Sequence, residues 1–276
     1  MDDSDEALLE AARAGDSKAL EALLARYQSQ VYRFGMRMCR DPEDAKDVLQ
    51  DTLIATARGV RDFRGASSIS TWLYSIARSF CIKKRRRSKF APEVERSLDT
   101  EVRDQVSAMP SSGRHPEDAV AGKQIQEALE RAIGRLEPMY REVLVLRDVE
   151  GLSAQEVSEV LDISVQAVKS RLHRARIAVR NDMLPLLQDQ PRTPAGASCP
   201  DVLQLFSQHL EDEISQDTCK RMEEHLEGCE RCRTTCNSLK QSLAMCRTAA
   251  PNVPLPEAVQ RSVRVALQEA LTAAES

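Results

Sequence analysis

One histidine and three cysteines in the last third of the chain have the spacing of a metal site. They are Cys199, His225, Cys229 and Cys232, in the pattern C-x25-H-x3-C-x2-C. Thiolate sulfur and imidazole nitrogen are the donors that Zn²⁺ prefers, and a Cys3His set completes a tetrahedral site. Other thiophilic ions, cadmium and copper among them, accept the same donors. The spacing therefore predicts a metal site and leaves the ion open among these metals.

The local geometry of these ligands has two solutions. His225 and Cys229 are four residues apart, so one helical face can present both. Alternatively, Gly228 ends that helix and the Cys229–Cys232 pair opens the next one. In either case Cys199 comes from an earlier helix. The metal would then hold two or three helices together, as a small module with few large apolar residues requires.

Further potential ligands surround this set. They are Cys219, Cys236, Cys246 and His209. One interpretation is a second, weaker sensing site built from them. Another is a single site whose occupancy is the signal, and a third is a permanent structural zinc with spare buried thiols. Cys39 and Cys81, far upstream, are interpreted as small core residues.

Basic side chains form a second group that could take part in binding. Residues 81–89 (CIKKRRRSK) and residues 164–180 contain several lysines and arginines and no acid, although the net charge of the chain is −4. In the segment after residue 198, acids outnumber bases. Two basic stretches and an acidic tail are typical of a DNA-binding protein with an added module that does not contact DNA.

The elements that carry these groups are expected to be helices. Leucine and alanine are abundant and aromatic residues make up only 4% of the chain, which favours an all-α fold. Gly15-Asp16 separates two helices within 5–39, and Asp41-Pro42 starts another. Ser153 and Glu156 form a capping box, and Ser164 caps the basic helix after a short turn, which is the helix-turn-helix pattern.

Composition divides the chain into parts. We expect a helical domain at 1–90, a mobile linker at 91–118, a second helical domain at 119–187, a Pro-rich linker at 188–198 and a cysteine-rich domain at 199–276, which closes with an amphipathic helix (Val259, Val263, Leu267, Leu271). No apolar run is long enough to span a membrane and the acidic start is unlike a signal peptide, so we expect a cytoplasmic protein without a membrane contact.

Two segments carry a resemblance to a known family. The segment DPEDAKDVLQDTLIATARGVRDFRGASSISTWLYSIARSFCIKKRRR resembles region 2 of an extracytoplasmic-function (ECF) sigma factor. The segment LEPMYREVLVLRDVEGLSAQEVSEVLDISVQAVKSRLHRARIAVR resembles its region 4. The resemblance implies a subunit that binds core RNA polymerase and directs it to promoter DNA, and that is not an enzyme.

The resemblance also implies roles for individual residues. The helix with Asp44, Asp47, Gln50 and Leu53 would bind the clamp of the polymerase β′ subunit. The −10 element would be bound by Arg64, Ser67, Ser68, Trp72, Arg78 and Ser79, with phosphate contacts from Lys83, Lys84 and Arg85. Trp72 has the alternative role of a core residue. The −35 element would be read in the major groove by Gln166, Lys169, Ser170, Arg171 and Arg174.

The cysteine-rich tail resembles a zinc-binding anti-sigma domain joined to the sigma factor, as in the CorE-like, metal-dependent type. This resemblance implies that metal binding changes how the tail contacts the sigma domains, in a metal-stress response. One alternative is a redox switch in which zinc-bound thiolates oxidise to a disulfide. Another is a helix-turn-helix regulator with a purely structural zinc. An enzyme is least favoured, because no H-x-E or HExxH motif supplies a general base.

Overall fold

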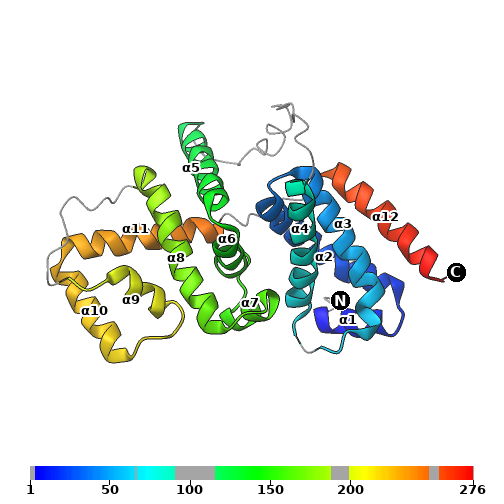
Figure 1. Ribbon diagram of the computed structural model, residues 1–276, viewed down its shortest axis with the longest axis horizontal. Helices are drawn as coiled ribbons and strands as arrows, with labels where there is room; N and C mark the ends of the chain where they lie inside the picture. The colour runs from blue at the N-terminus through cyan, green and yellow to red at the C-terminus, as the bar shows by residue number, and fades with distance from the viewer. Residues whose placement is uncertain (1–3, 66, 91–115, 188–198, 249–254, 276) are drawn as a thin grey trace.

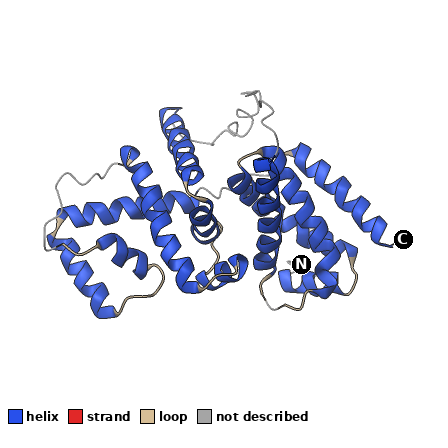
Figure 2. Cartoon of the chain, viewed as in Figure 1, coloured by secondary structure: helices blue, strands red, loops and turns tan. Residues whose placement is uncertain are grey.

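The fold is described for residues 4–65, 67–90, 116–187, 199–248 and 255–275 in a computed structural model (Figure 1). Throughout these ranges the regular elements are helices and no strand occurs, which confirms the predicted all-α fold (Figure 2). The predicted linkers at 91–118 and 188–198 lie outside the described residues, except that a helix already begins at Pro116.

The first group of helices forms a compact bundle. It consists of α1 (Asp5–Arg13), α2 (Ser17–Cys39), α3 (Pro42–Gly59), the 3₁₀ turn η1 (Val60–Asp62) and α4 (Ile69–Phe90). The predicted caps are present, since Asp16 accepts hydrogen bonds from the first turn of α2 and Asp41 from that of α3. Phe34 and Leu49 are fully buried where α2 and α3 pack together. The local signals in the sequence therefore place these helices correctly.

The second group contains the helix-turn-helix. It consists of α5 (Pro116–Arg135), α6 (Pro138–Leu144), the π-helical turn η3 (Val145–Val149), α7 (Ala154–Leu161), α8 (Val165–Met183) and the 3₁₀ turn η4 (Leu184–Leu186). The capping box of Ser153 and Glu156 starts α7, and Ser164 caps α8. Between the two helices Asp162 takes a left-handed conformation with φ of 54°, which makes the tight turn.

The tail consists of four helices that contact both preceding groups. They are α9 (Val202–His209), α10 (Gln216–Gly228), α11 (Glu230–Thr248) and α12 (Glu257–Glu275). In Figure 1, α9 and α10 lie beyond α8 and α11 runs behind it, while α12 lies at the opposite end of the molecule beside α3. The tail therefore reaches from the far side of the helix-turn-helix to the far side of the first bundle.

The two sigma-like groups also pack directly against each other. Helix α4 lies against α7, and α2 contacts α5 and α6. Buried residues of both groups, together with Cys246, Val259 and Val263 of the tail, belong to one continuous apolar cluster. A smaller cluster inside the tail contains Phe206, Cys236, Leu239 and Leu243. The arrangement is closed, with all three parts in contact.

Candidate functional site

The four residues predicted as metal ligands meet at one point. The ligand atoms of Cys199, His225, Cys229 and Cys232 all lie within 4.8 Å of one another. The sulfurs of Cys199 and Cys229 are 3.9 Å apart. This is the separation expected around a tetrahedral metal with bonds of about 2.0–2.3 Å. The four residues come from the start of the tail, the end of α10 and the start of α11, so a bound ion would join these segments.

The path of the backbone decides between the two geometries left open by the sequence. Helix α10 ends at Gly228, Cys229 has extended backbone angles, and α11 begins at Glu230. The pair of cysteines therefore opens α11. A hydrogen bond from the backbone of Cys232 is the largest cause of a lowered pKa at Cys229, which favours its thiolate. A helix N-terminus supports a thiolate in this way because its N–H groups point at the sulfur.

The donor set fits a cation. The Nε2 atom of His225 is buried and has no hydrogen-bond partner among the described residues. A buried nitrogen without such a partner is expected where a metal ion binds it. Burial, followed by the neighbouring sulfurs of Cys199 and Cys229, raises the pKa of Cys232 to about 12. A bound cation removes this repulsion between thiolates. The cluster is therefore suited to a thiophilic metal such as zinc.

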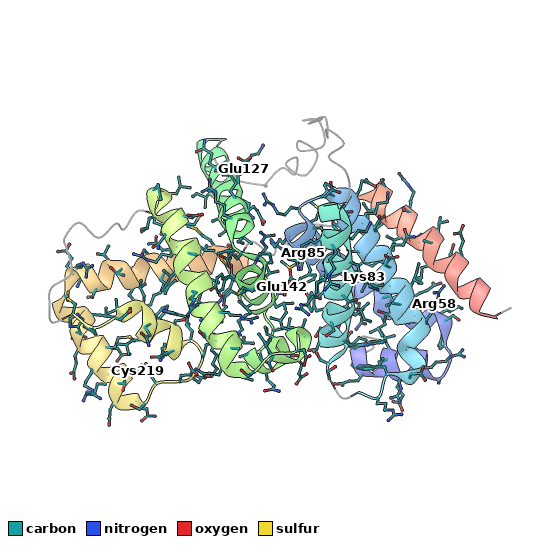
Figure 3. The ribbon with its side chains drawn as sticks, viewed as in Figure 1. Arg58, Lys83, Arg85, Glu127, Glu142 and Cys219 are labelled. Atoms are coloured by element: carbon teal, nitrogen blue, oxygen red, sulfur yellow. The ribbon has the colours of Figure 1, made fainter. Side chains whose placement is uncertain are left out.

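The structure does not bring the other four potential ligands together. Cys236 and Cys246 are buried in separate apolar clusters, and burial raises the pKa of both thiols, that of Cys246 to about 12. Only Cys219 and His209 meet, with 3.4 Å between Sγ and Nδ1. Figure 3 shows Cys219 on α10 at the outer end of the tail. The spare cysteines on α11 are core residues in this arrangement.

This geometry predicts a single strong metal site per chain. Replacing both Cys229 and Cys232 with serine should reduce bound zinc from about one ion per chain to nearly none, because two of four ligands are lost. The matched variant Cys236→Ser with Cys246→Ser should keep the ion. Zinc content after dialysis, measured by atomic emission, tests this. Retention of zinc by the first variant, or its loss from the second, would contradict the assignment.

The tail packs on the surface of α8 that the sequence predicts to read DNA. A cavity of about 270 Å³ separates α8 from α9 and the α9–α10 loop. Four of the five candidate −35 residues line it, and the fifth, Arg171, is half-buried elsewhere on α8. The four are Gln166, Lys169, Ser170 and Arg174. Lys169 bonds to Glu213 at 3.2 Å and to the backbone oxygen of Glu211 at 3.2 Å. In this closed form the tail occupies the approach to the helix.

Two arginines of the 164–180 stretch are buried rather than exposed for a contact with DNA. Arg176 is 2% exposed and donates two hydrogen bonds to Asp148, at 2.7 and 2.8 Å, and one to Glu211 at 2.8 Å. Burial alone would lower the pKa of Arg176, but these two carboxylates raise it. Arg180 donates to Ser238 of α11 at 2.6 Å. The contacts with Glu211 and Ser238 hold the tail on α8.

Three of the candidate −10 residues are held by acids of the second group of helices. Arg78 and Arg85 of α4 both donate to Glu142 of α6, at 3.0 and 2.9 Å. Figure 3 shows Arg85 and Glu142 where the two groups of helices meet. Ser68 bonds to Glu156 of α7 at 3.1 Å. The capping bond from the backbone of Ser153 is the largest cause of a lowered pKa at Glu156, so this acceptor stays charged.

The remaining candidate −10 residues are mostly at the surface. Arg64, Ser79 and Lys83 are exposed and Ser67 is half-buried. Trp72 is half-buried and stacks on Phe63 with ring centroids 4.6 Å apart. Its ring also closely approaches Gly59, where an added Cβ would lie 3.2 Å away. Trp72 therefore has a packing role in this conformation, which is the alternative role that the sequence allowed.

The candidate polymerase-binding residues lie on α3, the helix that α12 covers. Asp47 is exposed, Asp44 and Gln50 are half-buried, and Leu53 is fully buried. Lys84 of α4 pairs with both Asp44 and Asp47. Helix α12 packs along α3 and buries Val259, Val263 and Leu267, as its amphipathic pattern predicts. The fourth predicted residue of that pattern, Leu271, lies outside the described side chains.

The described helices include none that is long and apolar enough to cross a membrane.

Comparisons with known protein families agree with this organisation. The family model for sigma-70 region 2 matches residues 23–90, and the one for sigma-70 region 4 matches residues 126–179. A zinc-finger family model matches residues 199–233, the segment that contains all four ligands of the cluster. The two sigma-70 matches fall on the two helical groups, and the third falls on the tail.

Several characterised proteins are similar to about two thirds of the chain. The RNA polymerase sigma-H factor of Pseudomonas aeruginosa is 30% identical over 194 residues, which are 68% of this chain and 97% of that protein. The ECF RNA polymerase sigma factor SigW of Bacillus subtilis is 31% identical over 175 residues, which are 63% of this chain and 94% of SigW. A solved structure of CnrH in complex with the cytosolic domain of CnrY aligns with a TM-score of 0.47 and 24% identity, over 64% of this chain and 95% of that chain.

Sigma factors are initiation factors that bind core RNA polymerase and promoter DNA, and they are not enzymes. This chain matches nearly the full length of such factors and carries both sigma-70 regions in order. The resemblance drawn from the sequence is thereby confirmed at the level of the family. The chain belongs to the ECF family of RNA polymerase sigma factors.

Proposed function

We propose that this sigma factor is controlled by metal binding to its own cysteine-rich tail, as in the CorE-like type. The observation that carries the proposal is the position of the tail. The same segment that gathers three cysteines and a histidine also packs on α8 through α9 and α11, and on α3 through α12. Helix α11, which carries Cys232, therefore takes part both in the metal cluster and in the contact with α8, and α12 follows α11 in the same tail.

In this proposal the closed arrangement is the restrained form. Promoter binding needs α8 free to enter the −35 major groove and α4 free to bind the −10 element. Polymerase binding needs α3 free for the β′ clamp. The tail covers α8 and α3, and Glu142 of region 4 holds both Arg78 and Arg85 of α4. Metal shifts the equilibrium between the docked and the released tail because it binds one state more tightly than the other. A change of the population ratio from 1:99 to 99:1 needs a difference in binding free energy of about 5.5 kcal/mol.

Zinc, cadmium and copper are the candidate signals, because all three accept thiolate and imidazole donors. We place the protein in the cytoplasm, where core polymerase and the promoter are found. The two sulfurs of Cys199 and Cys229, 3.9 Å apart, also favour a second candidate, a redox switch in which they oxidise and release the metal. The comparisons favour both of these over a helix-turn-helix repressor, because they match region 2 as well as region 4.

Run-off transcription with core polymerase tests the proposal. The full-length chain is assayed after chelation and again after addition of Zn²⁺, Cd²⁺ or copper, with residues 1–187 in parallel. The shortened chain should transcribe more strongly than the restrained form of the full-length chain and should not respond to metal. The full-length chain should change its activity by at least tenfold with one of the metals. Equal transcription in all samples would rule out metal control, and a response to peroxide alone would support the redox candidate.

A further inference from the structure

Two cysteines outside the tail form a close pair. The sulfurs of Cys39, the last residue of α2, and Cys81, in α4, are 3.5 Å apart. The residues are 42 positions apart in sequence, and both are free thiols. Neither belongs to the metal cluster or to the candidate promoter-binding and polymerase-binding residues. Sulfur atoms in contact need to move only about 1.5 Å closer to reach the ~2.05 Å of a disulfide bond.

The two thiols differ in the way that a redox pair requires. Cys39 is half-buried, whereas Cys81 is 2% exposed. The hydrogen bond between the sulfurs is the largest cause of a lowered pKa at Cys39, and the charges of Arg85 and Lys84 act in the same direction. The same bond, with burial, raises the pKa of Cys81. A reachable cysteine that favours its thiolate beside a buried partner is the usual arrangement of a peroxide-sensitive thiol and its resolving thiol.

The pair also lies where the two halves of the sigma factor meet. Arg78 and Arg85, three residues before and four residues after Cys81 on α4, both bind Glu142 of region 4. Arg40, which follows Cys39, donates to the backbone oxygen of Gly134 on α5 at 3.3 Å. A covalent bond between Cys39 and Cys81 would fix the end of α2 against the part of α4 that contacts region 4.

We propose that Cys39 and Cys81 form a reversible, peroxide-sensitive disulfide site in region 2, separate from the metal site of the tail. The thiolate of Cys39 attacks one oxygen of hydrogen peroxide and displaces hydroxide, which leaves Cys39 as a sulfenic acid. The sulfur of Cys81 then attacks the sulfur of Cys39, and the hydroxyl group leaves with the proton of Cys81 as water. Two thiols lose two electrons and two protons, and one peroxide becomes two water molecules. A dithiol reductant reverses the step.

Peptide mapping of the full-length, zinc-loaded chain tests the proposal. The chain is treated with a small excess of hydrogen peroxide, its remaining thiols are alkylated, and it is digested with trypsin without reduction. Trypsin should release a peptide of residues 38–40 joined by a disulfide to a peptide of residues 79–83. The mass of the joined product should be two hydrogens below the sum of the two reduced peptides, and dithiothreitol should separate them. Detection of these two peptides only in their alkylated forms, or of Cys39 only as a sulfinic acid, would overturn the proposal.

Two variants and a stability measurement distinguish this pair from the cysteines of the tail. Cys81→Ser should abolish the joined peptide and leave a sulfenic acid at Cys39 that reacts with dimedone. Cys39→Ser should abolish both products. The oxidised wild-type chain should melt about 5 °C or more above its reduced form, because the bond closes a long loop in the unfolded chain. The rise should be absent from Cys39→Ser, and an equal rise there would assign the bond to other cysteines.

Discussion

Val263→Asp is expected to raise transcription by the full-length chain at least tenfold under the metal conditions that keep the tail docked. Val265→Asp should leave transcription unchanged under the same conditions. The two valines are two residues apart on α12, so they face different directions. Val263 is 1% exposed in the contact with the first bundle, and Val265 is 54% exposed. A carboxylate placed at the buried position loses its water and has no partner there, which costs several kcal/mol.

The size of this effect follows from how α12 is held. Its contact depends on Val259, Val263 and Leu267, and burial of such a side chain is worth about 1.5–3 kcal/mol. Loss of the central residue therefore removes a large part of the docking free energy. Each 1.4 kcal/mol changes the fraction of released helix by a factor of about ten. Under the proposal that α3 binds core polymerase, release of α12 would expose α3 for that contact.

Run-off transcription and the affinity of the chain for core polymerase measure the outcome. The melting temperature and helical circular dichroism of each variant show whether the fold persists. A chain that ends at residue 254 removes α12 altogether and gives an independent test. Unchanged polymerase affinity in both the shortened chain and the folded Val263→Asp variant would show that α12 does not compete with polymerase.

Local signals in the sequence were sufficient to predict the elements that carry the sites. A cap acts within one turn, so Asp16, Asp41, Ser153 and Ser164 each mark the start of a helix without knowledge of the rest of the fold. The metal ligands are also a local pattern, apart from Cys199. The four ligands of the predicted Cys3His site meet as their spacing predicts. Gly228 ends the helix that carries His225, and the next helix begins directly after Cys229.

The buried arginines of α8 show what a composition count misses. Arg176 follows Leu172 by four residues and precedes Val179 by three, so it lies on the apolar stripe of the helix. This spacing is present in the sequence and distinguishes Arg176 from the exposed Arg174. The spare cysteines give a similar signal, because Cys236, Leu239, Leu243 and Cys246 form one stripe with 3-4-3 spacing. The stripe indicates core packing rather than a second metal site.

The contacts between distant parts of the chain were beyond prediction from one sequence. Glu142, Glu150 and Glu211 are ordinary acids in the sequence, yet each accepts bonds from arginines in another part of the fold. Glu150, for example, also accepts a hydrogen bond from Tyr74 of α4 at 2.9 Å. Such pairs depend on how whole helices dock, which involves many weak contacts of long sequence separation. The amphipathic pattern of α12 predicted a helix with a buried face and did not identify α3 as its partner.

Glu211→Ala is expected to detach the tail from α8, and Glu213→Ala should have little effect. The two acids lie two residues apart in the α9–α10 loop. The Glu211 side chain is 3% exposed and binds Arg176 at 2.8 Å and Arg147 at 3.2 Å. Its loss leaves a buried cation short of a partner, which costs about 3–5 kcal/mol. The Glu213 side chain is 24% exposed and pairs with Lys169, a contact worth about 0–1 kcal/mol.

Hydrogen exchange followed by mass spectrometry measures this detachment directly. Amides of α9 should exchange roughly 100-fold faster in Glu211→Ala, because the free energy needed to detach the tail falls by about 3 kcal/mol. Zinc content should stay the same in both variants, since neither acid belongs to the cluster. Transcription under restraining conditions should rise with the exchange rate, because α8 becomes accessible to the −35 element. Faster exchange without a rise in transcription would show that the contact between the tail and α8 stabilises the fold and does not control promoter binding.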